Sequence, residues 1–195
     1  MGLLKLEDVS ENDIRFVRLN QKNDLFICRD VEYPGVDGML QGFAEHEFIF
    51  GNKPQKKFDI FLTSGDGILQ IQFGYSYTLL SLINCLMAIK DLKYNDILKI
   101  IIKKNKNGNP SLQVFYTNND ESIRGQYIKW RFSYDELKLS NLGSVEQEAR
   151  KNKILAEWTK KLIESLPSKI VRNTNYDNNN SANETDLIDD LDVPF

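Results

Sequence analysis

Residues that hold metals or form crosslinks are scarce in this sequence of 195 residues, which contains two cysteines and one histidine. Cys28 and Cys85 lie far apart without a CxxC spacing, and with His46 as the sole histidine they cannot build a Cys/His zinc site. Two such thiols are typical of a reduced, intracellular chain and argue against a disulfide framework. We therefore expect neither a bound metal nor another cofactor.

Long apolar segments and leader-like segments are also missing. The longest apolar-rich stretch, residues 79–89, is interrupted by Ser81 and Asn84 and is too short to span a bilayer. The first residues lack the apolar core and the small-residue cleavage site of a secretory signal. No glycine-rich phosphate loop leads into a Lys-Ser or Lys-Thr pair, which argues against a nucleotide hydrolase. The sequence thus predicts a soluble, cytoplasmic protein that does not bind membranes.

Basic residues are outnumbered overall, but the charge is unevenly distributed. The chain has 25 Lys and Arg against 28 Asp and Glu, and its formal net charge is −3. Residues 173–195 contain six acidic and no basic residues, which leaves a net charge of +3 on residues 1–172. Residues 99–172 hold 15 basic and 8 acidic residues. This asymmetry predicts an anionic partner for one part of the chain and an acidic tail elsewhere.

Alternating apolar and polar residues dominate the first 75 positions and predict β-strands. Glycine-containing turns at residues 33–38 and 64–67 separate some of these strands. The predicted strands are residues 25–31, 43–50, 57–63 and 69–75.

Apolar spacings of three and four residues then predict a helix over residues 79–89, apolar on most of its circumference. Alternation returns over residues 98–103 and 112–117, on either side of a turn at residues 106–109 whose Asn-Gly pair is a strong hairpin signal. A further strand is predicted over residues 126–134.

A second helix is predicted over residues 144–166, where Ser144 and Gln147 have the spacing of a capping box. An apolar stripe runs along this helix through Leu155, Trp158, Leu162 and Leu166. From residue 173 the chain is rich in asparagine and acidic residues, a composition that predicts disorder. We therefore expect one domain over residues 1–172 and a disordered acidic tail over residues 173–195. The order of elements predicts a mainly β protein with an OB-like small β-barrel, its helix between the third and fourth core strands.

The last ten residues, 186–195, combine acidic residues with a terminal Val-Pro-Phe. This tip resembles the C-terminal tip of bacterial and phage single-stranded DNA-binding proteins, where acidic residues lead into a final Pro-Phe. In that family the tip docks on replication and repair enzymes, with the phenylalanine in an apolar pocket and the acids against basic residues. Leu191 interrupts the acids here, whereas the family usually has consecutive acids. The resemblance implies that partner enzymes bind Asp189, Asp190, Asp192, Val193, Pro194 and Phe195.

Basic and aromatic side chains on one sheet face suit a single strand of nucleic acid, because phosphates need positive charge and bases stack on rings. Alternation over residues 126–134 places Lys129 and Arg131 on one face and Trp130 and Phe132 on the other, which we assign to the core. Lysines near the two hairpins add further basic patches. The predicted DNA-binding residues are Lys53, Lys56, Lys57, Phe61, Lys103, Lys104, Lys106, Phe115, Tyr127, Lys129 and Arg131.

The sequence therefore predicts a protein that coats single-stranded DNA during replication, recombination or repair and recruits enzymes through its tip, without catalysis. It leaves open whether the protein is a monomer or a small homo-oligomer. The composition, rich in Asn, Lys and Ile, is typical of an AT-rich genome such as that of a virus. One alternative is a docking adaptor that does not bind DNA. Another is a metal-dependent nuclease or recombination enzyme, although Gln70 and Gln72 stand where an acid and a lysine would be needed. Its acids would be Glu45, Glu47, Asp59 and Asp66.

Overall fold

The structure is a computed structural model that describes residues 14–20, 25–29, 31–50, 53–65, 67–104, 110–140 and 142–170. The predicted acidic tail with its tip and the turn at residues 106–109, which includes Lys106, lie outside the described residues. The side chains of Lys53 and Lys104 also lie outside the description.

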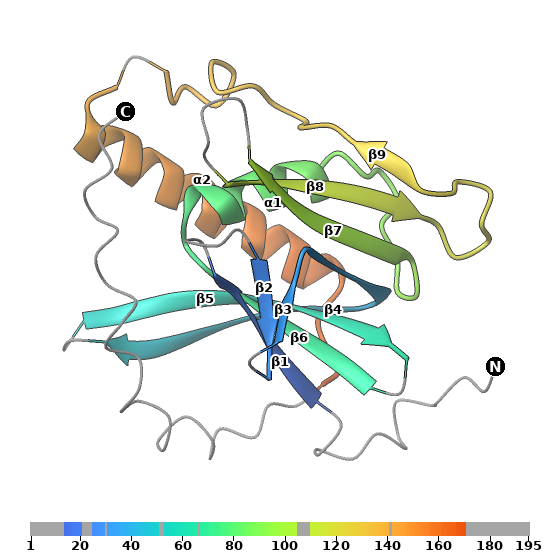
Figure 1. Cartoon of the computed structure of the whole chain (residues 1–195). Coiled ribbons are helices and arrows are strands. Elements are labelled where there is room, and N and C mark those ends of the chain that lie inside the picture. The colour runs from blue at the N-terminus through green and yellow to red at the C-terminus, as the bar shows by residue number, and fades with distance from the viewer. Residues whose placement is uncertain are drawn as a thin grey trace.

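The described residues form nine strands and two helices (Figure 1). In chain order they are β1 (Ile14–Asn20), β2 (Leu25–Cys28), β3 (Val31–Tyr33), β4 (Gly35–Phe50), β5 (Lys53–Ser64), β6 (Gly67–Gly74), α1 (Tyr77–Leu86), β7 (Ile97–Lys104), β8 (Pro110–Thr117), β9 (Gln126–Ile128) and α2 (Ser144–Ser165).

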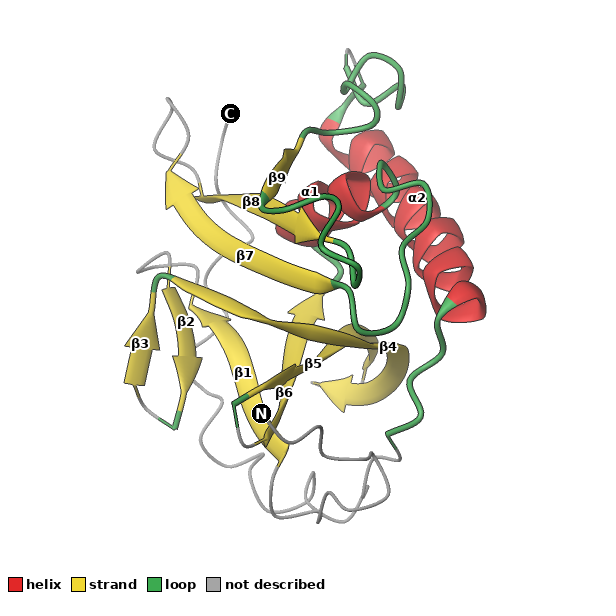
Figure 2. Ribbon diagram, turned by 90° about the vertical axis from the view of Figure 1, so that its right-hand side faces the viewer, coloured by secondary structure: helices red, strands yellow, loops and turns green. Residues whose placement is uncertain are grey.

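All nine strands belong to one curled sheet with the order β3-β2-β1-β6-β5-β4-β7-β8-β9 (Figure 2). Neighbouring strands are antiparallel, apart from the parallel pair of β1 with β6. The predicted mainly β class is confirmed, and the sheet has the shape of a half-barrel. It contains more strands than the sequence predicts, because β1 (Ile14–Asn20) was not predicted and the single strand predicted over residues 25–31 forms both β2 and β3.

The sheet bends along β4, which has a different partner at each end. Residues 39–50 of β4 pair with β5, and residues 35–39 pair with β7. Near the start of the β5-paired part, a bulge shifts the register between Leu40 and Gly42, and Gly42 has a φ of +121°. A Cβ atom at Gly42 would lie 2.8 Å from the Cα of Ser168, so both the backbone and the packing require glycine here.

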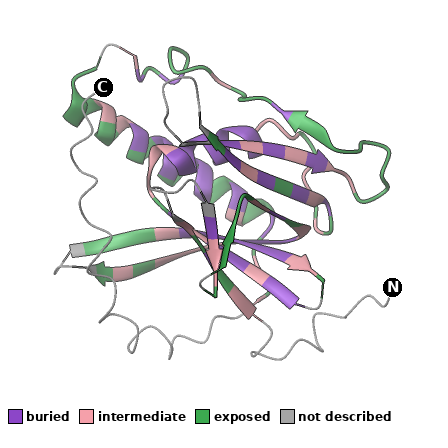
Figure 3. Cartoon of the chain, in the orientation of Figure 1, coloured by how far each residue is buried: buried purple, intermediate pink, exposed green. Residues whose placement is uncertain are grey.

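The core lies between the sheet and the two helices. Every residue of α1 from Thr78 to Leu86 is buried, as expected for the predicted helix with few polar positions (Figure 3). We call the side of the sheet that faces α1 the inner face and the opposite side the outer face. The predicted stripe on α2 is confirmed, since its members pack into the core. In the described part of the chain, no helix is both long and apolar enough to cross a membrane.

Several local predictions are wrong. The strand predicted over residues 25–31 is split into β2 and β3 by a turn at Arg29, whose φ is +49°. The turn predicted at residues 33–38 is limited to Pro34, because β4 begins at Gly35. The capping box does not form: Gly143 is the N-cap of α2, and the Gln147 side chain instead donates a hydrogen bond to the Leu139 carbonyl oxygen, at 2.8 Å.

The strand predicted over residues 126–134 ends at Ile128, because the buried amide of Asn84 on α1 binds the backbone that follows. Asn84 Oδ1 accepts hydrogen bonds from the backbone N–H groups of Arg131 and Phe132, at 3.1 and 3.0 Å. Asn84 Nδ2 donates to the Phe132 carbonyl oxygen at 2.7 Å. Trp130, expected in the core, is 36% exposed and donates a hydrogen bond to Ser81. The two faces predicted for residues 129–134 therefore do not exist as faces of a sheet.

Candidate nucleic-acid interface

The outer face of β7, β8 and β9 brings together three side chains in one line across the strands. Strand register places Lys99 opposite Phe115 and Phe115 opposite Tyr127. We call these three residues the aromatic–lysine row. Their neighbours along each strand, including Leu98, Val114 and Ile128, are buried on the inner face. Alternation along three adjacent strands thus fixes the row on the outer face.

The row has the chemistry that the sequence predicts for contact with single-stranded nucleic acid. Tyr127 is 47% exposed, and the ring centroids of Phe115 and Tyr127 are 5.6 Å apart with the planes at 53°. Lys103 is exposed on the same face of β7, and Lys129 is exposed just beyond β9. Asp37 on β4 lies opposite Lys99, so the basic part of this surface is on β7 to β9. Figure 1 shows these three strands side by side.

Lys99 belongs to the row, although it is not among the predicted DNA-binding residues. The predicted turn at residues 106–109 offered a signal, because counting outward from a hairpin turn pairs the two strands residue by residue. Such a count places Lys99 opposite or next to Phe115. Counting along this hairpin does not show that β9 pairs with β8, and that pairing is what brings Tyr127 next to Phe115.

The basic patch predicted on β5 is divided between the two faces of the sheet. Lys57 lies on the outer face, with its Nζ 4.4 Å from the centroid of the Phe48 ring. Lys56 points to the inner side and binds Glu45 at 2.7 Å and Glu47 at 3.5 Å. Hydrogen bonding to Glu45 raises the pKa of Lys56, which keeps the ion pair charged. A lysine already paired with two acids offers little charge to a phosphate.

Phe61 is on the outer face of β5 but is only 2% exposed. A base can stack on this ring only after the surrounding side chains move. The predicted patch of Lys56, Lys57 and Phe61 is therefore reduced to Lys57 at the surface that the structure describes.

Arg131 and Lys129, predicted to share a face, point to different parts of the surface. The guanidinium of Arg131 donates a hydrogen bond to the Met87 carbonyl oxygen at 2.8 Å, and it lies over the ring of Phe132. Arg131 thus extends toward the end of α1, whereas Lys129 stays next to β9. Arg131 is not part of the aromatic–lysine row.

Lys57 and Lys99, which both lie on the outer face, are far apart along the sheet. Lys57 lies opposite His46 of β4, and Lys99 lies opposite Asp37. His46 comes nine positions after Asp37 along β4, a path of about 30 Å at 3.3 Å per residue. Lys57 and Lys99 are therefore separated by most of the length of β4.

The carboxylates that a nuclease would need are also divided between the faces. Glu45 and Glu47 lie on the inner side, and Asp59, the cross-strand partner of Ala44, lies on the outer side. Among the residues that the structure describes, no three His, Cys, Asp or Glu side chains are grouped to hold a metal ion. Asp66 lies outside the described residues.

Glu45 is a structural residue that ties α2 to the sheet. Its carboxylate accepts hydrogen bonds from Lys56, Tyr75 and Thr159. Burial alone would raise the pKa of Glu45, but these three hydrogen bonds and the charge of Lys56 outweigh it and lower the pKa. Burial and the bond to Glu45 raise the pKa of Tyr75, which stays a neutral donor. The carboxylate of Glu45 therefore stabilises the packing of α2 against the sheet.

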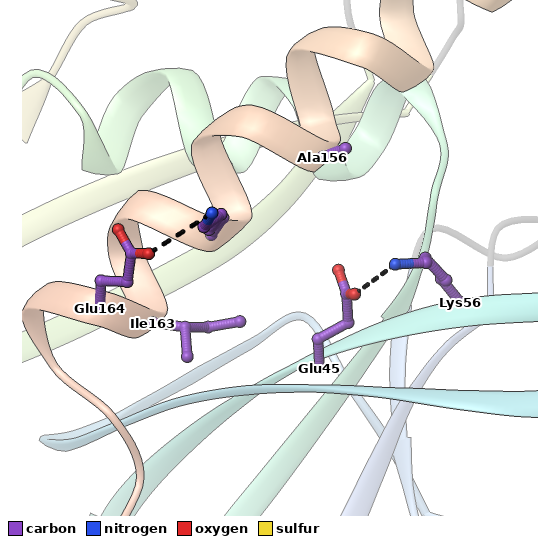
Figure 4. Close-up of a pocket in the computed structure, with 6 residues that line it drawn as sticks. Glu45, Lys56, Ala156, Ile163 and Glu164 are labelled. Atoms are coloured by element: carbon purple, nitrogen blue, oxygen red, sulfur yellow. Dashed lines mark hydrogen bonds and ion pairs between the residues drawn. The ribbon is translucent and has the colours of Figure 1, made fainter.

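A pocket of about 240 Å³ lies between α2 and the hairpin of β4 and β5 (Figure 4). Its charged side chains are paired on each side of the pocket: Lys56 of β5 with Glu45 of β4, and Lys160 with Glu164 within α2. Paired charges leave little net field for a charged ligand. The pocket is lined by Glu45, Lys56, Ala156, Lys160, Ile163 and Glu164.

Comparison of the chain with protein-family models, with curated proteins and with solved structures finds no match. The resemblance of residues 186–195 to the tips of single-stranded DNA-binding proteins thus stands on those ten residues.

Proposed function

We propose that this protein binds single-stranded DNA through the outer face of its sheet and does so stoichiometrically, without cleaving it. The observation on which this proposal rests is the aromatic–lysine row. Two adjacent aromatic rings with a lysine beside them offer a base a stacking surface and a phosphate a positive charge. The exposed Lys103 on β7 and Lys129 just after β9 add positive charge near the row.

The topology supports an OB-like interpretation of the central strands. β4 pairs with both β5 and β7, and α1 comes between β6 and β7 in the chain. An OB-fold is a five-stranded, partly open barrel that binds oligonucleotides across its strands and hairpin loops. We propose that β4, β5, β6, β7 and β8 correspond to its five strands. The additional strands β1 to β3 pair beyond β6 and β9 pairs beyond β8, so the sheet stays open where an OB-fold would close into a barrel.

The acidic tail and its tip fit the same function. We propose that the tip recruits replication or repair enzymes, with Phe195 as a hydrophobic anchor, and that the body holds the DNA. Deleting Phe195 alone tests this part. Retention of replication and repair enzymes on the immobilised protein should fall sharply, since one buried aromatic often dominates a small interface. DNA affinity should stay unchanged, because all six acids remain. Undiminished retention would refute the role of the tip.

The test of DNA binding is a fluorescence titration with oligo-dT and with duplex DNA of equal length, at two salt concentrations. We expect tighter binding to the single strand in the absence of metal. The logarithm of the affinity should fall with the logarithm of salt by about 0.7 for each phosphate neutralised. Equal affinity for duplex would contradict the proposal, and cleavage on addition of magnesium would favour a nuclease. No binding to either DNA would favour the docking adaptor.

A further inference from the structure

A second group of polar side chains lies on the outer face, away from the aromatic–lysine row. Asp59 on β5 is the cross-strand partner of Gln72 on β6, and Arg18 on β1 is the next residue in the same line. We call His46, Asp59, Gln70 and Gln72 the polar cluster. Asp59 and Gln70 are each 1% exposed. Burial of several polar groups on an outer sheet face calls for a full set of hydrogen bonds.

The set of hydrogen bonds in the polar cluster is incomplete. Asp59 Oδ2 accepts a bond from Gln70 Nε2 at 2.9 Å and lies 3.0 Å from His46 Nδ1. Asp59 Oδ1 and Gln72 Nε2 are buried and have no hydrogen-bond partner within the described part of the chain. A buried polar atom that stays unpaired destabilises the fold, because it has lost its hydrogen bonds to water without replacing them. The acceptor Asp59 Oδ1 and the donor Gln72 Nε2, on adjacent strands, could therefore both be satisfied by one group that donates and accepts hydrogen bonds at neighbouring positions.

We propose that Asp59 and Gln72 hydrogen-bond the edge of a nucleobase of the bound single strand. Base edges place an N–H donor beside a nitrogen or oxygen acceptor, which matches the two unpaired atoms. This inference rests on the proposed binding of single-stranded DNA and adds a base-reading contact to it. The contact requires outer-face side chains to shift on binding, because Asp59 is buried.

The surroundings of the polar cluster suit a nucleotide. Phe16 on β1 lies opposite Gln70 and is 49% exposed, so its ring is open to stacking. Arg18 is exposed beside Gln72, and Lys57 lies beside His46 on the neighbouring line. An exposed ring and two cations around a polar floor combine stacking, phosphate contact and base-edge contact in one place.

The test compares Gln72→Met with the matched control Gln113→Met in the full chain. Gln113 also lies on the outer face, on β8 next to the aromatic–lysine row, and both changes remove an amide without altering charge. The probes are oligo-dT of about 15 nucleotides and an abasic oligomer of equal length. We expect Gln72→Met to weaken oligo-dT binding about fivefold to tenfold and to leave abasic binding and the salt slope unchanged. Gln113→Met should leave the affinity for both probes unchanged.

Several outcomes separate this inference from the proposed function. An equal loss for both probes, or no loss for either, would overturn the base contact and leave an internal polar pair. Failure of the unmodified protein to bind oligo-dT would refute the proposed function as well. If Gln72→Met does not fold, the side-chain amide signal of Gln72 in the unmodified protein decides. It should shift in NMR spectra on adding oligo-dT and stay in place with the abasic oligomer, and an unmoved signal overturns the inference.

Discussion

Replacing Tyr127 by leucine should weaken binding of oligo-dT by about tenfold while leaving the fold intact. Base–aromatic stacking contributes about 1–3 kcal/mol per base, which corresponds to a factor of roughly 5 to 150 in affinity. We expect the lower half of this range, because the 47% exposed ring already contacts Phe115 and loses part of its surface to that contact. Leucine keeps apolar bulk on the short edge strand β9, so the free energy of unfolding should change by less than about 1 kcal/mol.

The assay is a fluorescence titration at two salt concentrations, with thermal unfolding measured in parallel. Tyr134→Leu is the matched control, since Tyr134 is 39% exposed but packs against Trp130 beside α1. The salt slope should be the same for both variants and for the unmodified protein, because neither change removes a charge. An equal loss of affinity in both variants, or a normal affinity for Tyr127→Leu, would refute the assignment of the aromatic–lysine row as a stacking surface.

Three further predictions concern charge and the anchored loop. Lys99→Ala should weaken binding to all DNA sequences alike and lower the magnitude of the salt slope by about 0.7. Lys56→Ala should leave the salt slope unchanged, because Lys56 is already paired with two acids. Titration at several salt concentrations checks both variants. Asn84→Ala should lower the free energy of unfolding by about 2–4 kcal/mol in urea denaturation, since backbone groups of residues 131–132 lose their hydrogen-bond partners. A change under about 1 kcal/mol would show that Asn84 does not hold this segment in place. Truncation after Arg172 removes six acids and shifts the net charge from −3 to +3. It should tighten binding to oligo-dT at low salt more than at high salt, because salt screens the repulsion between the tail and the DNA. Weaker binding of the truncated protein would show that the tail is part of the DNA site.

Local patterns were sufficient for the elements whose stability depends on nearby residues. Alternation predicted β5, β6, β7 and β8 within a few residues, and spacings of three and four predicted both helices. These patterns report that one side of an element is buried, and burial of that side is what forms the element. The bounds shifted where a turn had no glycine, as at Arg29, or where a glycine-rich stretch continued as a strand, as at Gly35.

The sequence predicted only some of the residues of the candidate site, for a physical reason. Alternation shows that two faces of a strand differ but does not show which acids or rings lie across from it. Lys56 and Lys57 were both predicted to bind DNA, and only the register showed that Glu45 and Glu47 lie beside Lys56. Phe115 and Tyr127 became a pair only when β9 was placed next to β8.

The sequence by itself determined the mainly β class, the buried helix, the hairpin of β7 and β8, and the apolar stripe of α2, because each follows from contacts within a short segment. Tertiary structure decided the nine-stranded order of the sheet, the end of β9 and the side of the sheet on which each charge lies. The amide of Asn84, more than 40 residues before β9, outcompetes a further strand pair for the backbone of residues 131–132. Such a competition between partners distant in the chain has no signature in the local pattern.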